Sequence, residues 1–211
     1  MGVKKSHTVM FDSKGVIHAQ RANLPLHKVP FATKRKIDSL EEAMQGADVF
    51  LGFSVGNVLK PTHLVGMAER PIIFALANPI PEIDPVLVRS KRPETIIGTG
   101  RSDYPNQINN ALIFPYLFRG LLDVRATKLT DSIKRAAVEA LASLGRGETL
   151  SETHDKPSFD AEHLLPNALD PRLLITIAPA VAKAAMEDGV AQKPINNWAE
   201  YRATLKKLPL K

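Results

Sequence analysis

The chain has 211 residues, of which 44% are hydrophobic and 24% charged, with 12 glycines and 16 prolines. These values are typical of one to one and a half folded domains, and they exclude collagen, coiled coil and an intrinsically disordered chain. The 28 Lys and Arg exceed the 22 Asp and Glu by six, which suits phosphate-bearing partners without requiring nucleic acid. Cysteine is absent, which excludes disulfides, thiolate metal sites and cysteine nucleophiles.

No apolar run approaches the roughly 18 residues that a membrane span needs. The N-terminus also lacks the apolar core of a secretion signal. We therefore expect a cytoplasmic protein with neither a membrane nor a nucleic acid as partner.

The first half of the chain predicts strands that alternate with helices. Four short apolar runs end at polar residues or glycine, at 8–11, 48–53, 71–77 and 95–97. Continuous apolar runs are typical of parallel strands covered on both faces. Between them the sequence predicts helices from Ser39, which begins a capping box, over 61–68 and over 85–90. The fold class is therefore α/β, a Rossmann-like, doubly wound, mostly parallel sheet.

The second half predicts helices only. The expected segments are 108–122 with a kink at Pro115, a helix from a Thr130 cap to Gly145, a helix from Asp170-Pro171 to Gly189 with a kink at Pro179, and a last helix over 198–205. A long loop is expected over 145–169. This region is a helical tail on the α/β domain.

The carboxyl ends of parallel strands gather ligands, so the residues after each apolar run are candidate site residues. Asp12 suits the acidic residue that accepts hydrogen bonds from an adenosine ribose, or an ordinary turn aspartate. The run 11–17 also resembles the first motif of haloacid-dehalogenase phosphatases, but Lys14 stands where that motif has its second aspartate. A lysine cannot ligate magnesium.

Three asparagines are further candidates. Pro79 restricts the backbone of Asn78, whose carboxamide offers both donors and an acceptor for a substrate or a nicotinamide amide. Asn109 and Asn110 are expected to open the helix over 108–122, where free N–H groups favour an anionic ligand. Ordinary roles in a turn and in a helix cap are the alternatives for these residues.

Other polar features favour no specific chemistry. The run Gly98-Thr99-Gly100-Arg101-Ser102-Asp103 departs from a phosphate loop because a carboxylate replaces the third glycine. The basic run 34–36 suits a solvated surface or, near Asp12, a 2′-phosphate. The six histidines are scattered and predict neither a metal cluster nor a catalytic triad.

Several stretches together resemble the cofactor-binding half of bacterial malic enzymes. The main ones are Phe74-Ala75-Leu76-Ala77-Asn78-Pro79, the run from Thr99 to Asn110, and Phe118 to Ala126. Shorter stretches at 12–15, 46–50 and 178–182 fit the family in the same order. Malic enzymes oxidise L-malate with NAD or NADP and decarboxylate the product to pyruvate, with Mg²⁺ or Mn²⁺ polarising the C2 oxygen.

The resemblance assigns substrate binding to Asn78, Asn109 and Asn110. It assigns cofactor binding to Asn78 and Asn109 as well. The other residues that it assigns to the cofactor follow the earlier strands: Asp12, Ser13, Lys14, Ser54 and Val55. Ile80 departs from the family, where we expect an acidic residue. The negative charge of Asp12 disfavours the 2′-phosphate of NADP, but lysines 14, 28 and 34 offset that charge. The resemblance to bacterial malic enzymes favours NADP over NAD.

The family's Gly-rich turn, catalytic tyrosine and lysine, and acidic metal ligands lie upstream of the strand that ends at Asp12. The resemblance therefore implies a C-terminal piece with no catalytic residue and no metal ligand of its own, inactive alone. In the complete enzyme the resemblance implies malate, pyruvate and a dinucleotide as ligands. It also implies an N-terminal malate-binding domain and assembly into a homo-oligomer. The alternative is a non-catalytic module that binds a nucleotide or metabolite, or regulates a full-length partner.

We expect two domains, an incomplete NAD(P)-binding domain over 1–126 and a helical extension over 127–211. In the order 3-2-1-4-5-6 the lacking first strand lies in the middle of the sheet. Because unpaired strand edges invite association, residues 6–35 are expected to be poorly anchored, or the gap to be filled by another chain.

Overall fold

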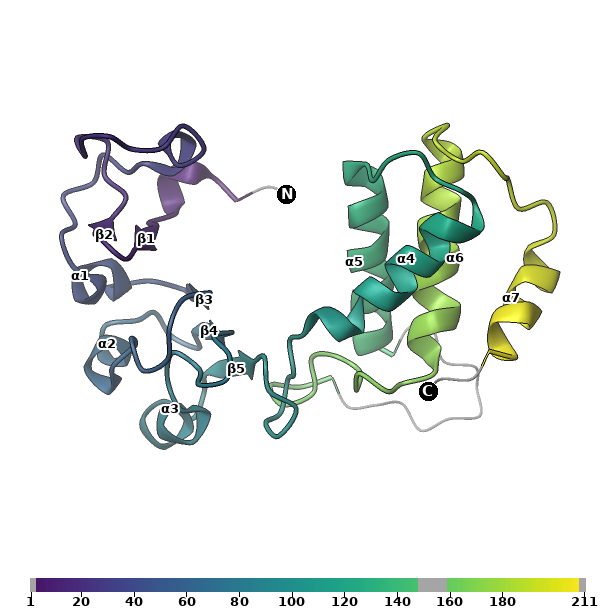
Figure 1. Cartoon of the computed structure of the whole chain (residues 1–211). Coiled ribbons are helices and arrows are strands. Elements are labelled where there is room, and N and C mark those ends of the chain that lie inside the picture. The colour runs from purple at the N-terminus through teal and green to yellow at the C-terminus, as the bar shows by residue number, and fades with distance from the viewer. Residues whose placement is uncertain (1–2, 148–158, 209–211) are drawn as a thin grey trace. The chain divides into compact units, whose positions relative to one another are not determined.

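Strands and helices alternate through the first part of the chain, and helices alone make up the last part (Figure 1). This computed structural model describes residues 3–147 and 159–208. The chain divides into two compact units, Met1–Ile97 and Gly98–Lys211, and the division falls within a strand. Each unit is described by itself below.

The first unit is built on a sheet with the strand order β3-β4-β5. β3 (Val49–Gly52) and β4 (Ile72–Ala75) are parallel, and β5 (Ile96–Thr99) lies on the other side of β4. These strands confirm three of the four predicted apolar runs. The α/β class is therefore confirmed.

The helices between these strands begin where the sequence predicts them. They are α1 (Leu40–Met44), α2 (Pro61–Val65) and α3 (Pro85–Lys91). The Ser39 side chain accepts a hydrogen bond from the Glu42 N–H, as the capping box predicts, and Asp84 caps α3. Apolar side chains of the helices pack with those of the sheet in one cluster: Met44, Leu59, Leu64, Met67, Ile73, Ala75, Ile83, Val88 and Ile97.

The sequence predicts that both faces of the sheet are covered, but one face is exposed at β3. Ile73 and Ala75 of β4 are fully buried. On the neighbouring strand, however, Val49 is 48% exposed and Leu51 55%. The continuous apolar run therefore overstates the burial of β3, because none of the described residues 3–97 of the first unit covers these two side chains.

The predicted strand over 8–11 was wrong. The structure has instead a hairpin of β1 (Phe11–Asp12) and β2 (Gly15–Val16), which pair antiparallel with each other and not with β3-β4-β5. Gly15 has a φ of +98°, which favours glycine at this tight turn. Two single turns of 3₁₀ helix, η1 (Lys5–His7) and η2 (Val29–Phe31), flank the hairpin in sequence.

The second unit is a helical bundle around α6 (Arg172–Glu187). α4 (Phe114–Asp123) and α5 (Asp131–Gly145) pack on it, and α7 (Trp198–Lys206) also contacts it (Figure 1). Leu173, Ile177 and Val181 of α6 are fully buried at its centre. A methyl group on Gly120 would lie 2.5 Å from the Ala178 carbonyl oxygen, so α4 and α6 approach closely.

Most of the predicted helices of this unit are confirmed, with one correction. Thr130 accepts a hydrogen bond from the Ile133 N–H and caps α5. The helix expected from 108, by contrast, begins at Phe114, so Pro115 lies in its first turn and kinks nothing. The described residues 159–169 contain neither helix nor strand, as the predicted loop requires, whereas 148–158 lie outside the described residues. In the described parts of the chain, no helix has the length and apolar character of a membrane span.

Candidate functional site

A cavity of about 260 Å³ lies where β3 and β4 end, in the first unit. Adjacent parallel strands present their carboxyl ends at one edge of the sheet, where α/β proteins bind ligands. The loops after the two strands line the cavity with Ser54, Val55, Gly56 and Asn57 from one side and Ala77, Asn78, Pro79 and Ile80 from the other. The structure thus brings together the predicted residues Ser54, Val55 and Asn78.

The Asn78 side chain is a polar group that is available to a ligand in this cavity. Asn78 is exposed, and within the described residues its carboxamide makes no hydrogen bond. The peptide bond between Asn78 and Pro79 is cis. A free carboxamide with both donors and an acceptor fits a ligand that carries amide, hydroxyl or carboxylate groups.

The two loops touch at a glycine. A methyl group on Gly56 would lie 2.6 Å from the Ile80 side chain and 2.9 Å from its carbonyl oxygen. Asn57 follows with a φ of 61°, and its N–H donates to the Pro81 carbonyl over 3.0 Å. Only a residue without a side chain fits at position 56, so this glycine lets the two loops that line the cavity approach each other.

A buried carboxylate that the sequence analysis missed lies beneath these loops. Glu82 is fully buried, and its oxygens accept hydrogen bonds from the Ser54 N–H and the Ala77 N–H, both over 2.9 Å. The Ser54 hydroxyl lies 3.5 Å from the same carboxylate. The available indication was an acidic residue between the apolar residues Ile80 and Ile83, because carboxylates are rarely fully buried unless their oxygens are bonded.

Asp12, predicted at the ribose end of a dinucleotide, is surrounded by cations. The Arg21 guanidinium lies 2.8 Å from one carboxylate oxygen, and the Lys28 ammonium lies 2.6 Å from the other. The Lys14 N–H also donates to Asp12, which is the turn role considered above. Hydrogen bonds from Arg21 and then from Lys28 hold the pKa of Asp12 well below its ordinary value. Asp12 is therefore ionised, and both of its oxygens are already bonded to cations.

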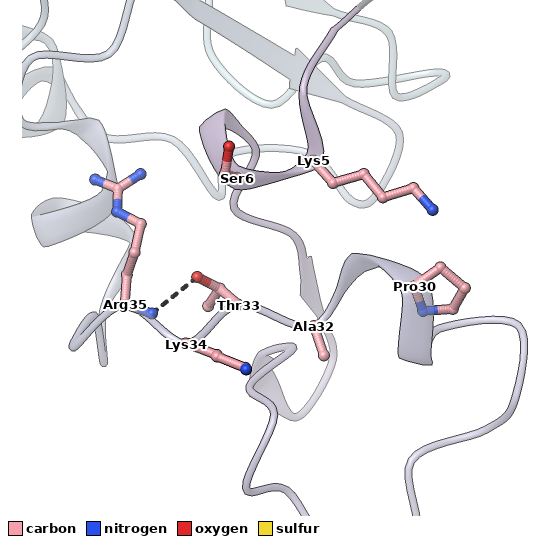
Figure 2. Close-up of a pocket in the computed structure, with 7 residues that line it drawn as sticks. All are labelled: Lys5, Ser6, Pro30, Ala32, Thr33, Lys34 and Arg35. Carbon is pink, nitrogen blue, oxygen red and sulfur yellow. Dashed lines mark hydrogen bonds between the residues drawn. The ribbon is translucent and has the colours of Figure 1, made fainter.

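The basic run 34–36 does not pair with Asp12. Lys34 and Arg35 instead line a cavity of about 400 Å³ with Lys5, Ser6 and neighbouring residues (Figure 2). Figure 2 shows the Lys5 ammonium and the Arg35 guanidinium pointing to different sides, so the cations do not converge on one point. The run 34–36 is therefore a solvated basic surface.

In the second unit, Asn109 acts as a cap. Its carbonyl oxygen accepts from the Ala111 N–H over 3.0 Å, and its amide donates to the Gly100 carbonyl over 3.2 Å. It precedes a 3₁₀ turn, η3 (Asn110–Leu112), rather than a long helix. Asn110 is exposed and is free to meet a ligand. Of these two residues, Asn109 is therefore already hydrogen-bonded within the chain, whereas Asn110 is available to a ligand.

The glycine-containing run after β5 is a turn, as expected. The Arg101 guanidinium binds Asp103 through two hydrogen bonds of 2.8 and 2.6 Å, so this carboxylate is satisfied within the turn. The Arg101 N–H donates to the Thr99 hydroxyl. Nearby, the buried Asn106 binds the Ala161 carbonyl and the Leu164 N–H, which attaches the described end of the long loop.

No metal site accompanies these features in the described residues. Within 3–147 and 159–208 there is no group of three His, Asp or Glu side chains that could hold an ion. The residues present therefore do not fit a divalent metal by themselves.

Taken together, the parallel strands and the cavity at their carboxyl ends place the chain in the α/β class of proteins, which bind ligands at this edge of the sheet. Comparison with known proteins narrows this class. The model of the family described as malic enzyme, NAD binding domain, matches residues 86–186. The chain belongs to the malic enzyme family and carries its NAD-binding domain.

Relatives and solved structures agree along most of the chain. An NADP-dependent malic enzyme of Halomonas elongata is 46% identical over 92% of this chain and 47% of its own length. An NAD-dependent malic enzyme of Rhizobium meliloti is 44% identical over 95% of this chain and 27% of its own length. The crystal structure of Entamoeba histolytica malic enzyme matches with a TM-score of 0.80 and 33% identity, over 94% of this chain and 41% of that one. The chain thus spans less than half the length of these relatives.

Proposed function

We propose that this chain is the C-terminal, dinucleotide-binding portion of an enzyme that oxidises L-malate and decarboxylates the product to pyruvate and CO₂. The free carboxamide of Asn78 in the cavity after β3 and β4 is the observation that carries this proposal. In the proposed role it binds the nicotinamide side of the cofactor and the substrate. Ser54 and Val55 line the dinucleotide on the facing loop.

The proposal gives the remaining candidates separate roles. Asp12, ionised and flanked by Ser13 and Lys14, accepts hydrogen bonds from the adenosine ribose. Asn110 contacts malate, and Asn109 supports it as the bonded cap of the same turn. NADP is the proposed cofactor rather than NAD, because Arg21 and Lys28 already compensate the charge of Asp12.

We further propose that the isolated chain is inactive. A divalent ion supplies Lewis-acid polarisation of the malate C2 oxygen, but the described residues contain no set of ligands to hold one. The metal ligands, the catalytic tyrosine and lysine and the Gly-rich phosphate turn would come from a malate-binding part of a longer enzyme, which assembles as a homo-oligomer. The two domains proposed for this chain remain 1–126 and 127–211.

The test is an assay of the 211-residue chain with malate, NADP and Mn²⁺, together with calorimetry against NADP and NAD. We expect no turnover, and weak binding that favours NADP. Turnover by the isolated chain would show that it holds the catalytic groups after all. Equal or tighter binding of NAD would refute the proposed cofactor.

A second test concerns the residues before β3. We expect limited proteolysis to cut within 6–35 faster than within 70–125, because the hairpin of β1 and β2 pairs only with itself and not with the sheet. Equal resistance of both regions in a monomer would contradict this expectation.

A further inference from the structure

The Glu82 carboxylate binds the ends of two strands at once. Ser54 lies two residues beyond β3 and Ala77 two residues beyond β4, and the N–H groups of both donate to it over 2.9 Å. In the described part of the chain no Lys, Arg or His pairs with Glu82. A fully buried polar group is tolerated only where hydrogen bonds replace its water, so these two bonds are expected to matter for the stability of the loops.

The backbone next to Glu82 extends the same connection. The Glu82 carbonyl accepts from the Leu59 N–H over 2.9 Å, and the Pro81 carbonyl accepts from the Asn57 N–H over 3.0 Å. The loop after β3 is therefore held to the loop after β4 along its length. Both loops line the candidate cavity.

Gly52 makes room for this arrangement. A methyl group there would lie 2.3 Å from the carboxyl carbon of Glu82 and 2.5 Å from one of its oxygens. The end of β3 thus requires a residue without a side chain so that the carboxylate can reach Ser54 and Ala77.

We infer that Glu82 is a positioning residue of the dinucleotide site: its carboxylate fastens the loop 54–59 to the loop 77–82 and so fixes Asn78 against its facing loop. Because the N–H groups of Ser54 and Ala77 are already used, the ligand meets side chains and other backbone groups on this face. The link to a dinucleotide rests on the proposed function, whereas the link between the loops does not.

Amide hydrogen exchange, followed by NMR on the ¹⁵N-labelled 211-residue chain, tests the link between the loops. In the unchanged protein the Ser54 and Ala77 amides should exchange as slowly as that of Phe74 within β4. In Glu82→Gln the side-chain NH₂ group faces one of the two donors, so that amide should exchange roughly tenfold faster or more, while Phe74 is unchanged. Glu69→Gln, an exposed residue of the same unit, is the control and should change none of them.

The same samples test the positioning of the site. The Asn78 side-chain signals and the Val55 amide should shift or broaden in Glu82→Gln, and titration with NADP should perturb them at about tenfold higher concentration than in the unchanged protein. Gly52→Ala should reproduce both effects by displacing the carboxylate. A Glu82→Gln protein with unchanged Asn78 signals and NADP response would refute the positioning role.

The outcomes separate the two proposals. Fast exchange of Ser54 and Ala77 in the unchanged protein refutes the link between the loops, even if Glu82→Gln fails to fold. If NADP perturbs nothing in the unchanged protein while Glu82→Gln still speeds the exchange of one of these amides and alters Asn78, the proposed function of the isolated chain fails and the role of Glu82 in fixing Asn78 is supported.

Discussion

The two units of this chain are held together in different ways. In Gly98–Lys211, apolar side chains of α4, α5 and α6 form one large cluster with Leu173, Ile177 and Val181 fully buried. In Met1–Ile97 the cluster is smaller, the β3 face is exposed, and a buried carboxylate joins the loops that line the candidate site. The difference teaches that the helical unit depends on apolar packing, whereas the sheet unit depends on single polar contacts at the edge that holds the candidate site.

The largest expected effect comes from removing apolar volume in the helical unit. Leu117 on α4 is 5% exposed and belongs to the cluster, so Leu117→Ala should lower the free energy of unfolding by about 2–5 kcal/mol through lost burial and a cavity. Urea unfolding followed by Trp198 fluorescence measures this, because Trp198 is the chain's single tryptophan and packs on the same cluster.

Leu122 provides the matched control on the same helix. It is 73% exposed, so Leu122→Ala should change the free energy of unfolding by less than about 0.5 kcal/mol. Equal losses for the two variants would contradict the claim that packing dominates in this unit.

The close approach of α4 and α6 gives the next effect. Gly120→Ala would place a methyl group 2.5 Å from the Ala178 carbonyl and 2.8 Å from the Val181 side chain. Overpacking of this kind costs about 1–3 kcal/mol, which exceeds the gain of up to about 1 kcal/mol that alanine offers in a helix. Thermal unfolding by circular dichroism should therefore show a lower Tm, and an unchanged or higher Tm would mean that the helices separate without cost.

The N-terminal cap of α5 should matter less. Thr130 accepts a hydrogen bond from the Ile133 N–H, so Thr130→Ala should cost about 1 kcal/mol in the same urea experiment. Thr130→Ser keeps the hydroxyl and is the control, with a loss well below that of alanine. A loss in Thr130→Ser as large as in Thr130→Ala would assign the effect to the methyl group instead of the cap.

The helical unit was predictable from sequence because its information is local. Thr130 and Gly145 marked the ends of α5, and the apolar period gave the buried stripe. The start of α4 was missed because the apolar run from Ile108 hid a 3₁₀ turn, and Pro115 fits the first turn of a helix as well as a kink.

The sheet unit was predictable in its strands and in three residues that line the candidate cavity, but not in its contacts. Ser54, Val55 and Asn78 were predicted because strand ends gather ligands. Glu82 was not, because its partners lie 28 residues away at Ser54 and in a backbone N–H at Ala77 that no pattern of side chains reveals. The strand expected over 8–11 failed for a related reason, since a strand exists only where another backbone pairs with it.

The smallest expected effect is a pH dependence of the sheet unit that arises from one buried histidine. His63 on α2 is 9% exposed, and its Nδ1 accepts from the Lys60 N–H over 3.1 Å. Burial lowers the pKa of His63, and the charge of Lys60 lowers it further against the opposing charge of Glu41. As the pH falls, the unfolded chain therefore binds this proton at a higher pH than the folded chain does. The free energy of unfolding keeps its full value above pH about 6.5 and decreases as the pH falls towards the folded pKa.

His63→Gln should remove this dependence, which makes the free energy of unfolding differ less between pH 7.5 and pH 5.5 than in the unchanged chain. Urea unfolding by far-ultraviolet circular dichroism at the two pH values measures the difference, and titration of the His63 ring signals by NMR gives the pKa directly. His7→Gln, at an exposed position of the same unit, is the control and should leave the dependence in place. Equal losses of stability on acidification in His63→Gln and in the unchanged chain would show that the buried histidine of α2 does not cause the pH dependence. Of the two polar contacts that distinguish the sheet unit, only that of Glu82 would then remain.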